Sequence, residues 1–287
     1  MTTLLTITCA SLVARGEPAL ASAPTTRPTD ADFARHVDAL RDRLSDEFTV
    51  VVEKPFVVIG DESPGMVRRR ATDTVGWAVE KLKRDYFDVD PDHVIDVWLF
   101  KDKPSYERNA KRLFGSLPHT PYGYYSPSDR ALVMNIATGG GTLVHEIVHP
   151  FVAANFPKCP SWLNEGLGSL YEQSAERNGR IIGLTNWRLA GLQRAIRAKR
   201  LPSFEKLIAT KQDEFYNDDR GDNYAQARYL CYYLQEKGLL TQFVRAFMAN
   251  VDEDPTGYDT LKKTLGEEDM SAFAAKWEAY VMKLKFP

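Results

Sequence analysis

Residues 145 to 149 read His145-Glu146-Ile147-Val148-His149, and this pentapeptide decides how the rest of the chain is interpreted. In a helix, residues four apart lie about 40° apart around the axis, so both imidazoles face one side and can bind one metal ion. Glu146 lies about 100° from His145, which places its carboxylate within reach of a water held by that ion. The spacing therefore predicts two metal ligands and a general base on one helix.

The residues on either side of the pentapeptide favour a helix there. The run Thr138-Gly139-Gly140-Gly141-Thr142 supplies a helix breaker and a threonine that can cap a helix, and Pro150 follows directly after His149. A proline inside a helix removes one hydrogen bond and kinks the backbone. We therefore expect the helix to bend or end near His149, after both ligands.

A third ligand is expected in the segment Trp162-Leu163-Asn164-Glu165-Gly166. A catalytic zinc usually has three protein ligands and an open fourth position, and two histidines with one glutamate are a common set. Residues 150 to 164 leave room for a loop and for a second helix that opens at Pro160-Ser161. The expected cofactor is Zn²⁺, with His145, His149 and Glu165 as its ligands.

Three further side chains near this segment have open roles. Glu172 lies seven residues beyond Glu165 and either accepts a hydrogen bond from a ligand imidazole or is a solvated helix carboxylate, the commoner state. Cys159 and Cys231 either pair or remain separate thiols. A cysteine as fourth ligand would close the site, which contradicts catalysis.

With both motifs in place, the chain resembles the gluzincin group of zinc metallopeptidases, and more narrowly the bacterial peptidase-MA-like families. In those families a W-L-x-E-G-x-A/G-x-Y stretch carries the glutamate ligand, and the matching residues here are Trp162, Leu163, Glu165, Gly166 and Gly168. The resemblance covers residues 120 to 240. It implies a zincin-like fold, in which a mixed sheet with an antiparallel edge strand precedes the metal helix, and a peptide or protein substrate.

The resemblance extends to a later helix. Residues 222 to 238 are similar to a Y-x-x-A/S-x-x-x-x-x-Y-L-x-x-x-x-G helix that supplies a hydroxyl or a cation to the tetrahedral intermediate in these enzymes. The resemblance makes Tyr224 the candidate oxyanion stabiliser, with Arg228 as second choice. The alternative is that Tyr224 only packs, with its hydroxyl at the surface.

The expected activity is zinc-dependent hydrolysis of peptide bonds. Zinc polarises the scissile carbonyl and lowers the pKa of its water, while Glu146 takes the proton and returns it to the leaving amine. Two other functions stay open. One is a zinc-binding scaffold without turnover, against which the presence of Glu146 argues, because such a protein could lose this residue freely. The other is a zinc hydrolase of a non-peptide amide or ester. Substrate profiling separates the last from a peptidase.

Composition sets further bounds. The chain has 287 residues, of which 44% are apolar and 26% charged, which is typical of a globular protein. A net charge of −2 and a pI near 6.2 give no electrostatic case for nucleic acid. No stretch reaches the roughly 18 consecutive apolar residues of a spanning helix, so no integral membrane span is expected. The oligomeric state is left open.

The N-terminus resembles an export signal in part. Residues 4 to 13 are apolar, and Ala21-Ser22-Ala23 is a plausible signal-peptidase site. No lysine or arginine precedes the apolar stretch, and Arg15 and Glu17 interrupt the approach to that site. We expect export to the periplasm or the exterior, with a start further upstream or a cytoplasmic location as the alternatives.

The periodicities predict an α+β fold in which a small mixed sheet with helices is followed by a helical C-terminal subdomain. Residues 1–30 are a signal-like segment and linker, 31–155 an α/β subdomain ending in the metal-binding helix, and 156–287 a helical subdomain carrying the third ligand. The expected cleft lies between the two subdomains.

Strands are expected at 48–52, 56–59, 93–100, 122–125 and 131–136, and helices at 31–45, 64–87 and 104–114. Strands 48–52 and 56–59 form a hairpin or one bent strand, and 122–125 with 131–136 form a second hairpin. Strand 131–136 is either the edge strand beside the cleft or paired on both sides. After residue 156 the chain is expected to be almost wholly helical, with helices at 161–174, 186–199, 203–210, 222–237, 239–249 and 267–284.

Overall fold

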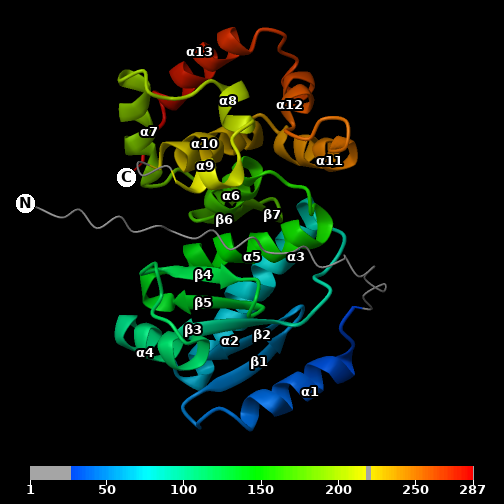
Figure 1. Ribbon diagram of the computed structural model, residues 1–287, viewed down its shortest axis with the longest axis vertical. Helices are drawn as coiled ribbons and strands as arrows, with labels where there is room; N and C mark the ends of the chain where they lie inside the picture. The colour runs from blue at the N-terminus through cyan, green and yellow to red at the C-terminus, as the bar shows by residue number, and fades with distance from the viewer. Residues whose placement is uncertain (1–26, 218–220, 287) are drawn as a thin grey trace, which may run out of the picture.

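The computed structural model describes residues 27–217 and 221–286 (Figure 1). The predicted signal segment and its cleavage site therefore lie outside the described residues. Within them, the α+β fold is confirmed: a five-stranded mixed sheet is followed by a helical region. No helix of this part of the chain combines the length and the apolar character needed to cross a membrane.

The sheet has the strand order β1-β2-β3-β5-β4. Its strands are β1 (Thr49–Glu53), β2 (Phe56–Gly60), β3 (Ile95–Phe100), β4 (Gly123–Ser126) and β5 (Ala131–Asn135). The three central strands run parallel, and β1 and β4 pair antiparallel to their neighbours. Both predicted hairpins, β1–β2 and β4–β5, are confirmed by this register.

The edge strand beside the cleft is β4, which corrects one prediction. Strand β5 is paired on both sides, parallel to β3 and antiparallel to β4. The resemblance implies an edge position for 131–136, and the structure shows the alternative, a strand paired on both sides. Its burial explains the central position, since all five residues of β5 are buried and fully buried strands belong to the interior of a sheet.

Helices cover both faces of the sheet (Figure 1). Helices α1 (Asp30–Arg41) and α4 (Lys103–Phe114) lie on one face, and α2 (Pro64–Arg70), the π-helical turn Ala71–Gly76, α3 (Trp77–Asp85) and α5 (Gly140–Asn155) lie on the other. Alternate side chains of β2 show this division, since Val57 and Ile59 pack toward α1 and Phe56 and Val58 pack toward α5. The α2-to-α3 run agrees with the predicted helix 64–87.

The sequence predicts a bend or an end near His149. Helix α5 continues through Pro150 to Asn155, so the predicted end is wrong. A proline in a helix interior costs about 3 kcal/mol. Phe151 and Val152, which follow it, are buried in the core, and burying such side chains contributes roughly 1.5–3 kcal/mol each. Packing of the last helical turn against the core offsets the lost hydrogen bond.

The C-terminal region is a layer of helices that lies beyond α5 (Figure 1). It contains α6 (Ser161–Leu170), α7 (Arg188–Arg197), α8 (Phe204–Ile208), α9 (Gln212–Tyr216), α10 (Asp222–Glu236), α11 (Leu240–Asn250), α12 (Tyr258–Leu265) and α13 (Met270–Val281). Helices α9 and α12 were not predicted. Helix α6 packs against both α5 and α10, which places it where a residue can face the pentapeptide.

A short hairpin contradicts the expectation of an almost wholly helical C-terminal part. Strands β6 (Ser174–Arg177) and β7 (Arg180–Gly183) pair antiparallel around Asn178 and Gly179. Both turn residues have positive φ, 54° and 76°. Asn-Gly is the preferred pair for such a two-residue hairpin turn, and the expected helix 161–174 ends at Leu170 instead.

Candidate metal centre

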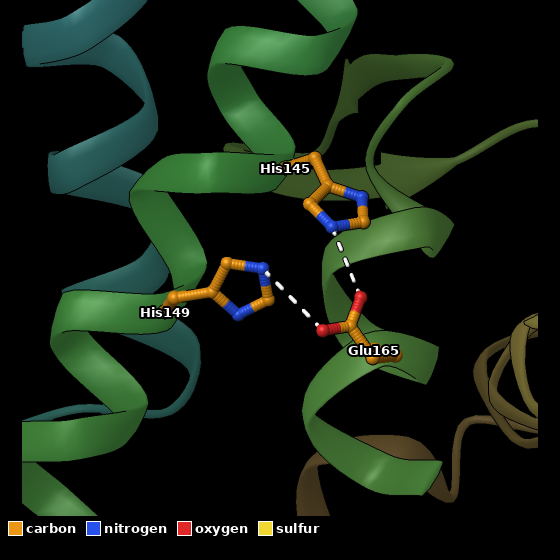
Figure 2. Close-up of side chains that lie close together, drawn as sticks. All are labelled: His145, His149 and Glu165. Carbon is orange, nitrogen blue, oxygen red and sulfur yellow. Dashed lines mark ion pairs between the residues drawn. The ribbon is translucent and has the colours of Figure 1, made fainter. Parts of the chain in front are cut away.

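The two histidines of the pentapeptide and Glu165 converge on one point (Figure 2). His145 and His149 lie on α5, and Glu165 faces them from α6. The Nε2 atom of His145 is 3.2 Å from Oε2 of Glu165, and Nε2 of His149 is 3.9 Å from Oε1. One potential ligand atom from each residue lies within 4.8 Å of the others.

Burial and donor type make this cluster able to bind a metal ion. His145 is 7% exposed and Glu165 is 4% exposed, and a buried carboxylate needs a cation or strong hydrogen bonds to offset its desolvation. Two imidazoles and one carboxylate are a ligand set that divalent transition metals accept. Within the described residues, no other group of His, Cys, Asp and Glu meets the same geometry.

Glu172 stands behind His145. Its Oε1 lies 3.4 Å from Nδ1 of His145, and the same carboxylate accepts hydrogen bonds from Arg188 at 2.6 and 2.9 Å and from Asn186 at 3.0 Å. Glu172 is only 9% exposed, so the solvated-carboxylate interpretation is wrong. The residue lies just past α6, in a turn that still directs it at the imidazole.

His149 has a matching partner that the sequence did not reveal. Its Nδ1 lies 2.9 Å from Oδ1 of Asn164, the residue that precedes Glu165. Asn164 and Glu172 both offer oxygen acceptors to Nδ1, and an imidazole that donates its proton there can bind a metal ion through Nε2. The outer contacts therefore orient both rings for binding through Nε2.

Charges inside the cluster are strongly coupled. Burial opposes the charged form of His145, but the neighbouring Glu165 and Glu172 outweigh burial and raise the pKa of His145 well above its usual range. Burial also opposes the charge on Glu165, but His145 and His149 lower the pKa of that carboxyl. The site is thus built to hold positive charge between acidic groups, which a bound cation can supply in place of a proton.

Glu146 lies on the cleft side of the cluster. Its Oε2 is 3.8 Å from Nε2 of His149, and its side chain lines two adjoining cavities of about 480 and 600 Å³. Both cavities are also lined by His145, Tyr224 and Gly123, the first residue of β4. The open side of the cluster therefore faces a cleft between the sheet's edge strand and the helical region.

The two candidate oxyanion residues occupy different places. Tyr224 lines both cavities, and its ring lies 5.3 Å from the guanidinium of Arg188. Arg228 is 0% exposed, donates hydrogen bonds to the carbonyls of Ser169, Leu170 and Leu184, and lines neither cavity. The Arg228 guanidinium links α10 to α6 and to the residue after β7 instead of lining the cleft. This position does not support Arg228 as the second candidate for oxyanion stabiliser.

The glycines after Glu165 allow close packing. A Cβ atom at Gly168 would lie 3.0 Å from Nε2 of His145, and one at Gly166 would lie 3.0 Å from the sulfur of Cys231.

Cys159 and Cys231 are both free thiols, and burial raises the pKa of each. Cys159 lines the smaller cavity but is outside the three-residue cluster.

Tyr216 is a further site residue that sequence reasoning missed. Its hydroxyl donates a 2.6 Å hydrogen bond to Oε1 of Glu165. The residue ends α9, a five-residue helix with no motif and little periodicity. No local signal connects residues 165 and 216, because their contact depends on how the helices pack.

The fold and the cluster define an α+β protein with a candidate metal-binding site in a cleft. A family described as "Protein of unknown function (DUF1570)" matches residues 139–255. The matched segment holds His145, Glu146, His149 and Glu165 as well as Tyr216 and Tyr224. No curated protein matches the chain.

Proposed function

We propose that this protein is a zinc-dependent metallopeptidase of the gluzincin, peptidase-MA-like type. The observation that carries the proposal is the convergence of His145, His149 and Glu165 beside a cleft that Glu146 also lines. A site with three protein ligands and an open side is typical of catalytic zinc rather than of structural zinc, which is closed by four.

Glu146 is the proposed general base and acid. Bound zinc would supply a Lewis acid that polarises the scissile carbonyl and acidifies water. The Glu146 carboxylate lies beside the cluster and faces the cavity, so it can take a proton from the attacking water and deliver it to the leaving amine. The Nδ1 contacts of both histidines hold the imidazoles still during this transfer.

Tyr224 is the proposed oxyanion stabiliser. Its ring contacts the guanidinium of Arg188 and the rings of Phe215 and Tyr216. Among the described residues none forms a hydrogen bond with its hydroxyl, which leaves that hydroxyl able to donate to a developing oxyanion. Removing one such donor typically costs 10²–10³ in kcat.

The edge strand β4 favours a peptide as substrate. Among the described strands it pairs with β5 alone, and Gly123, Tyr124 and Tyr125 line the cavity that holds the cluster. An exposed strand edge offers unpaired backbone N–H and C=O groups, with which an extended peptide can pair as an added strand. This feature has no use in binding a small ester.

A mixed peptide library tests the proposal. The zinc-loaded wild type is expected to cleave peptides, while Glu146→Gln loses about 10²–10⁴ in kcat/KM with its zinc content unchanged. Glu253→Gln, which alters an exposed glutamate far along the chain, is the matched control and keeps full activity. Wild-type zinc protein that cleaves nothing, or Glu146→Gln that cleaves normally, contradicts the peptidase assignment.

A further inference from the structure

Tyr216 contacts the metal-site glutamate from a separate element. It is the last residue of α9, and its hydroxyl donates to Oε1 of Glu165 at 2.6 Å. Among the described residues, no other hydroxyl donates to this carboxylate. The contact is therefore a specific link between α9 and α6 at the metal cluster.

The two carboxylate oxygens of Glu165 have different contacts. Oε2 lies 3.2 Å from Nε2 of His145, whereas Oε1 lies 3.9 Å from Nε2 of His149 and also accepts the hydrogen bond from Tyr216. A carboxylate that gives one oxygen to a metal ion keeps acceptor capacity on the other. The hydroxyl of Tyr216 fills that capacity and stops the carboxylate from rotating.

The ring of Tyr216 is held independently of its hydroxyl. It packs against Phe215 and Tyr224, with ring centroids 5.8 and 6.2 Å away, and Phe215 is fully buried. Tyr216 itself is 44% exposed, so loss of the hydroxyl opens no cavity in the core, and the one group that loses a donor is the buried carboxylate of Glu165. Tyr216→Phe is thus a change of one hydrogen bond.

We propose that Tyr216 is a positioning residue of the metal centre, whose hydroxyl fixes the Glu165 carboxylate so that one oxygen faces the ion. This inference rests on the metal site of the proposed function but not on peptidase activity. Partners that orient a metal ligand typically contribute 10- to 100-fold to metal affinity. Zinc binding, measured without substrate, is therefore the direct readout.

The neighbouring Tyr224 provides a matched control. It belongs to the same aromatic group and the same cavity as Tyr216, but its hydroxyl makes no hydrogen bond to His145, His149 or Glu165. Tyr224→Phe therefore removes the same atom from the same surroundings without touching the ligands. It is expected to lower turnover and to leave zinc affinity unchanged.

The experiment titrates metal-free protein with zinc in competition with a chromophoric chelator. Tyr216→Phe is expected to raise the zinc Kd about 10- to 100-fold, and Tyr224→Phe to leave it unchanged. The visible absorption of the Co²⁺-loaded proteins is expected to change for Tyr216→Phe alone, because it reports ligand geometry. Equal melting temperatures of the metal-free proteins show that both variants fold.

Each result separates this inference from the proposed function. A wild type that binds zinc, together with a Tyr216→Phe variant of unchanged Kd and unchanged cobalt spectrum, overturns the role of Tyr216 and leaves the metal site standing. Equal loss of affinity in both tyrosine variants also overturns it, because packing rather than the hydroxyl would then be responsible. A wild type that binds no zinc contradicts the proposed metal site itself.

Discussion

His145 is the more deeply buried of the two histidines of the cluster. Glu165 faces its Nε2 and Glu172 its Nδ1, while the backbone of α6 at Gly168 lies against the ring. Metal sites need their ligands held within about 0.5 Å of the productive position. Small changes around this imidazole should therefore alter metal affinity before they alter the fold.

Gly168→Ala tests this enclosure. The added Cβ would lie 3.0 Å from Cδ2 and from Nε2 of His145, so the ring must shift by a few tenths of an ångström. We expect zinc affinity to fall roughly 10-fold or more, measured by competition titration. Gly191→Ala is the control, because a Cβ atom there would make no close contact: the nearest atom, on Arg194, is 3.9 Å away.

Gly191→Ala should keep the zinc affinity of the wild type and gain up to about 1 kcal/mol of stability from better helix propensity. Unchanged zinc binding in both alanine variants would show that the imidazole is not confined by α6.

Glu172→Gln tests the support behind His145. The substitution removes the charge that pairs with Arg188 at 2.6 Å, and breaking a buried pair from one side costs about 3–5 kcal/mol. We expect a lower melting temperature together with a 10- to 100-fold weaker zinc affinity. In Glu176→Gln, where an exposed carboxylate pairs with Lys81, the loss of stability should be much smaller, because solvent screens an exposed ion pair. Equal effects of the two substitutions would refute a special role of Glu172.

The members of the cluster were predictable where one helix sets the geometry or, for Glu165, where a second recognisable motif follows in the sequence. His145, Glu146 and His149 could be placed together because helical spacing alone fixes their relation. The role of Asn164 and the burial of Glu172 could not, since both depend on how α6 meets α5. Tyr216 lies 51 positions from its partner, and no local pattern encodes such a contact.

At the scale of elements, the strongest local signals were those of periodic segments. Helices at 104–114 and 222–237 and both hairpins of the sheet follow from spacing and turn residues. The Asn178-Gly179 pair is an equally clear hairpin signal, and the expectation of an almost wholly helical C-terminal part left it unused. Pro150 shows the opposite case, in which burial in the core overrides a local rule.

Helix α1 is joined to the sheet by a contact that depends on pH. Nε2 of His36 lies 2.7 Å from Oδ1 of Asp96 on β3, and this hydrogen bond raises the pKa of His36 above 6.5. The raised pKa means that the folded state holds the proton more tightly than the unfolded state. The stabilisation is therefore fully present below pH 6.5 and is lost as pH rises through the raised value.

We expect the melting temperature of the wild type to fall relative to that of Asp96→Asn between pH 6 and pH 8. Since His36 is partly exposed, the difference should be no more than about 1 kcal/mol, or roughly 2–4 °C. Thermal unfolding of both proteins across this pH range measures it. Parallel curves would show that the His36 contact does not stabilise the docked helix.

At the scale of the whole molecule, the cluster joins the sheet to the helical region. Helix α5 packs on the sheet and supplies two ligands, and α6 packs on α10 and supplies the third. The buried apolar core runs through the same elements, from β2 to α13. A bound ion should therefore stabilise the entire fold rather than one loop.

Metal removal is expected to lower the melting temperature of the whole chain. A ligand present at 1,000 times its Kd contributes about 4 kcal/mol, which corresponds to a shift of roughly 5–10 °C for a protein of this size. Thermal unfolding with zinc and with a chelator measures the shift. His149→Ala should show the same melting temperature in both conditions, and a wild type insensitive to the chelator would contradict a bridging metal.

Elemental analysis of the purified proteins, after reconstitution with zinc, tests the central claim most directly. We expect about one zinc per chain in the wild type and in Glu146→Gln, and essentially none in His149→Ala. This pattern separates the ligand role of the histidine from the role of Glu146 as a base. Zinc that is absent from the wild type, or retained in full by His149→Ala, would contradict the metal centre on which the proposed peptidase depends.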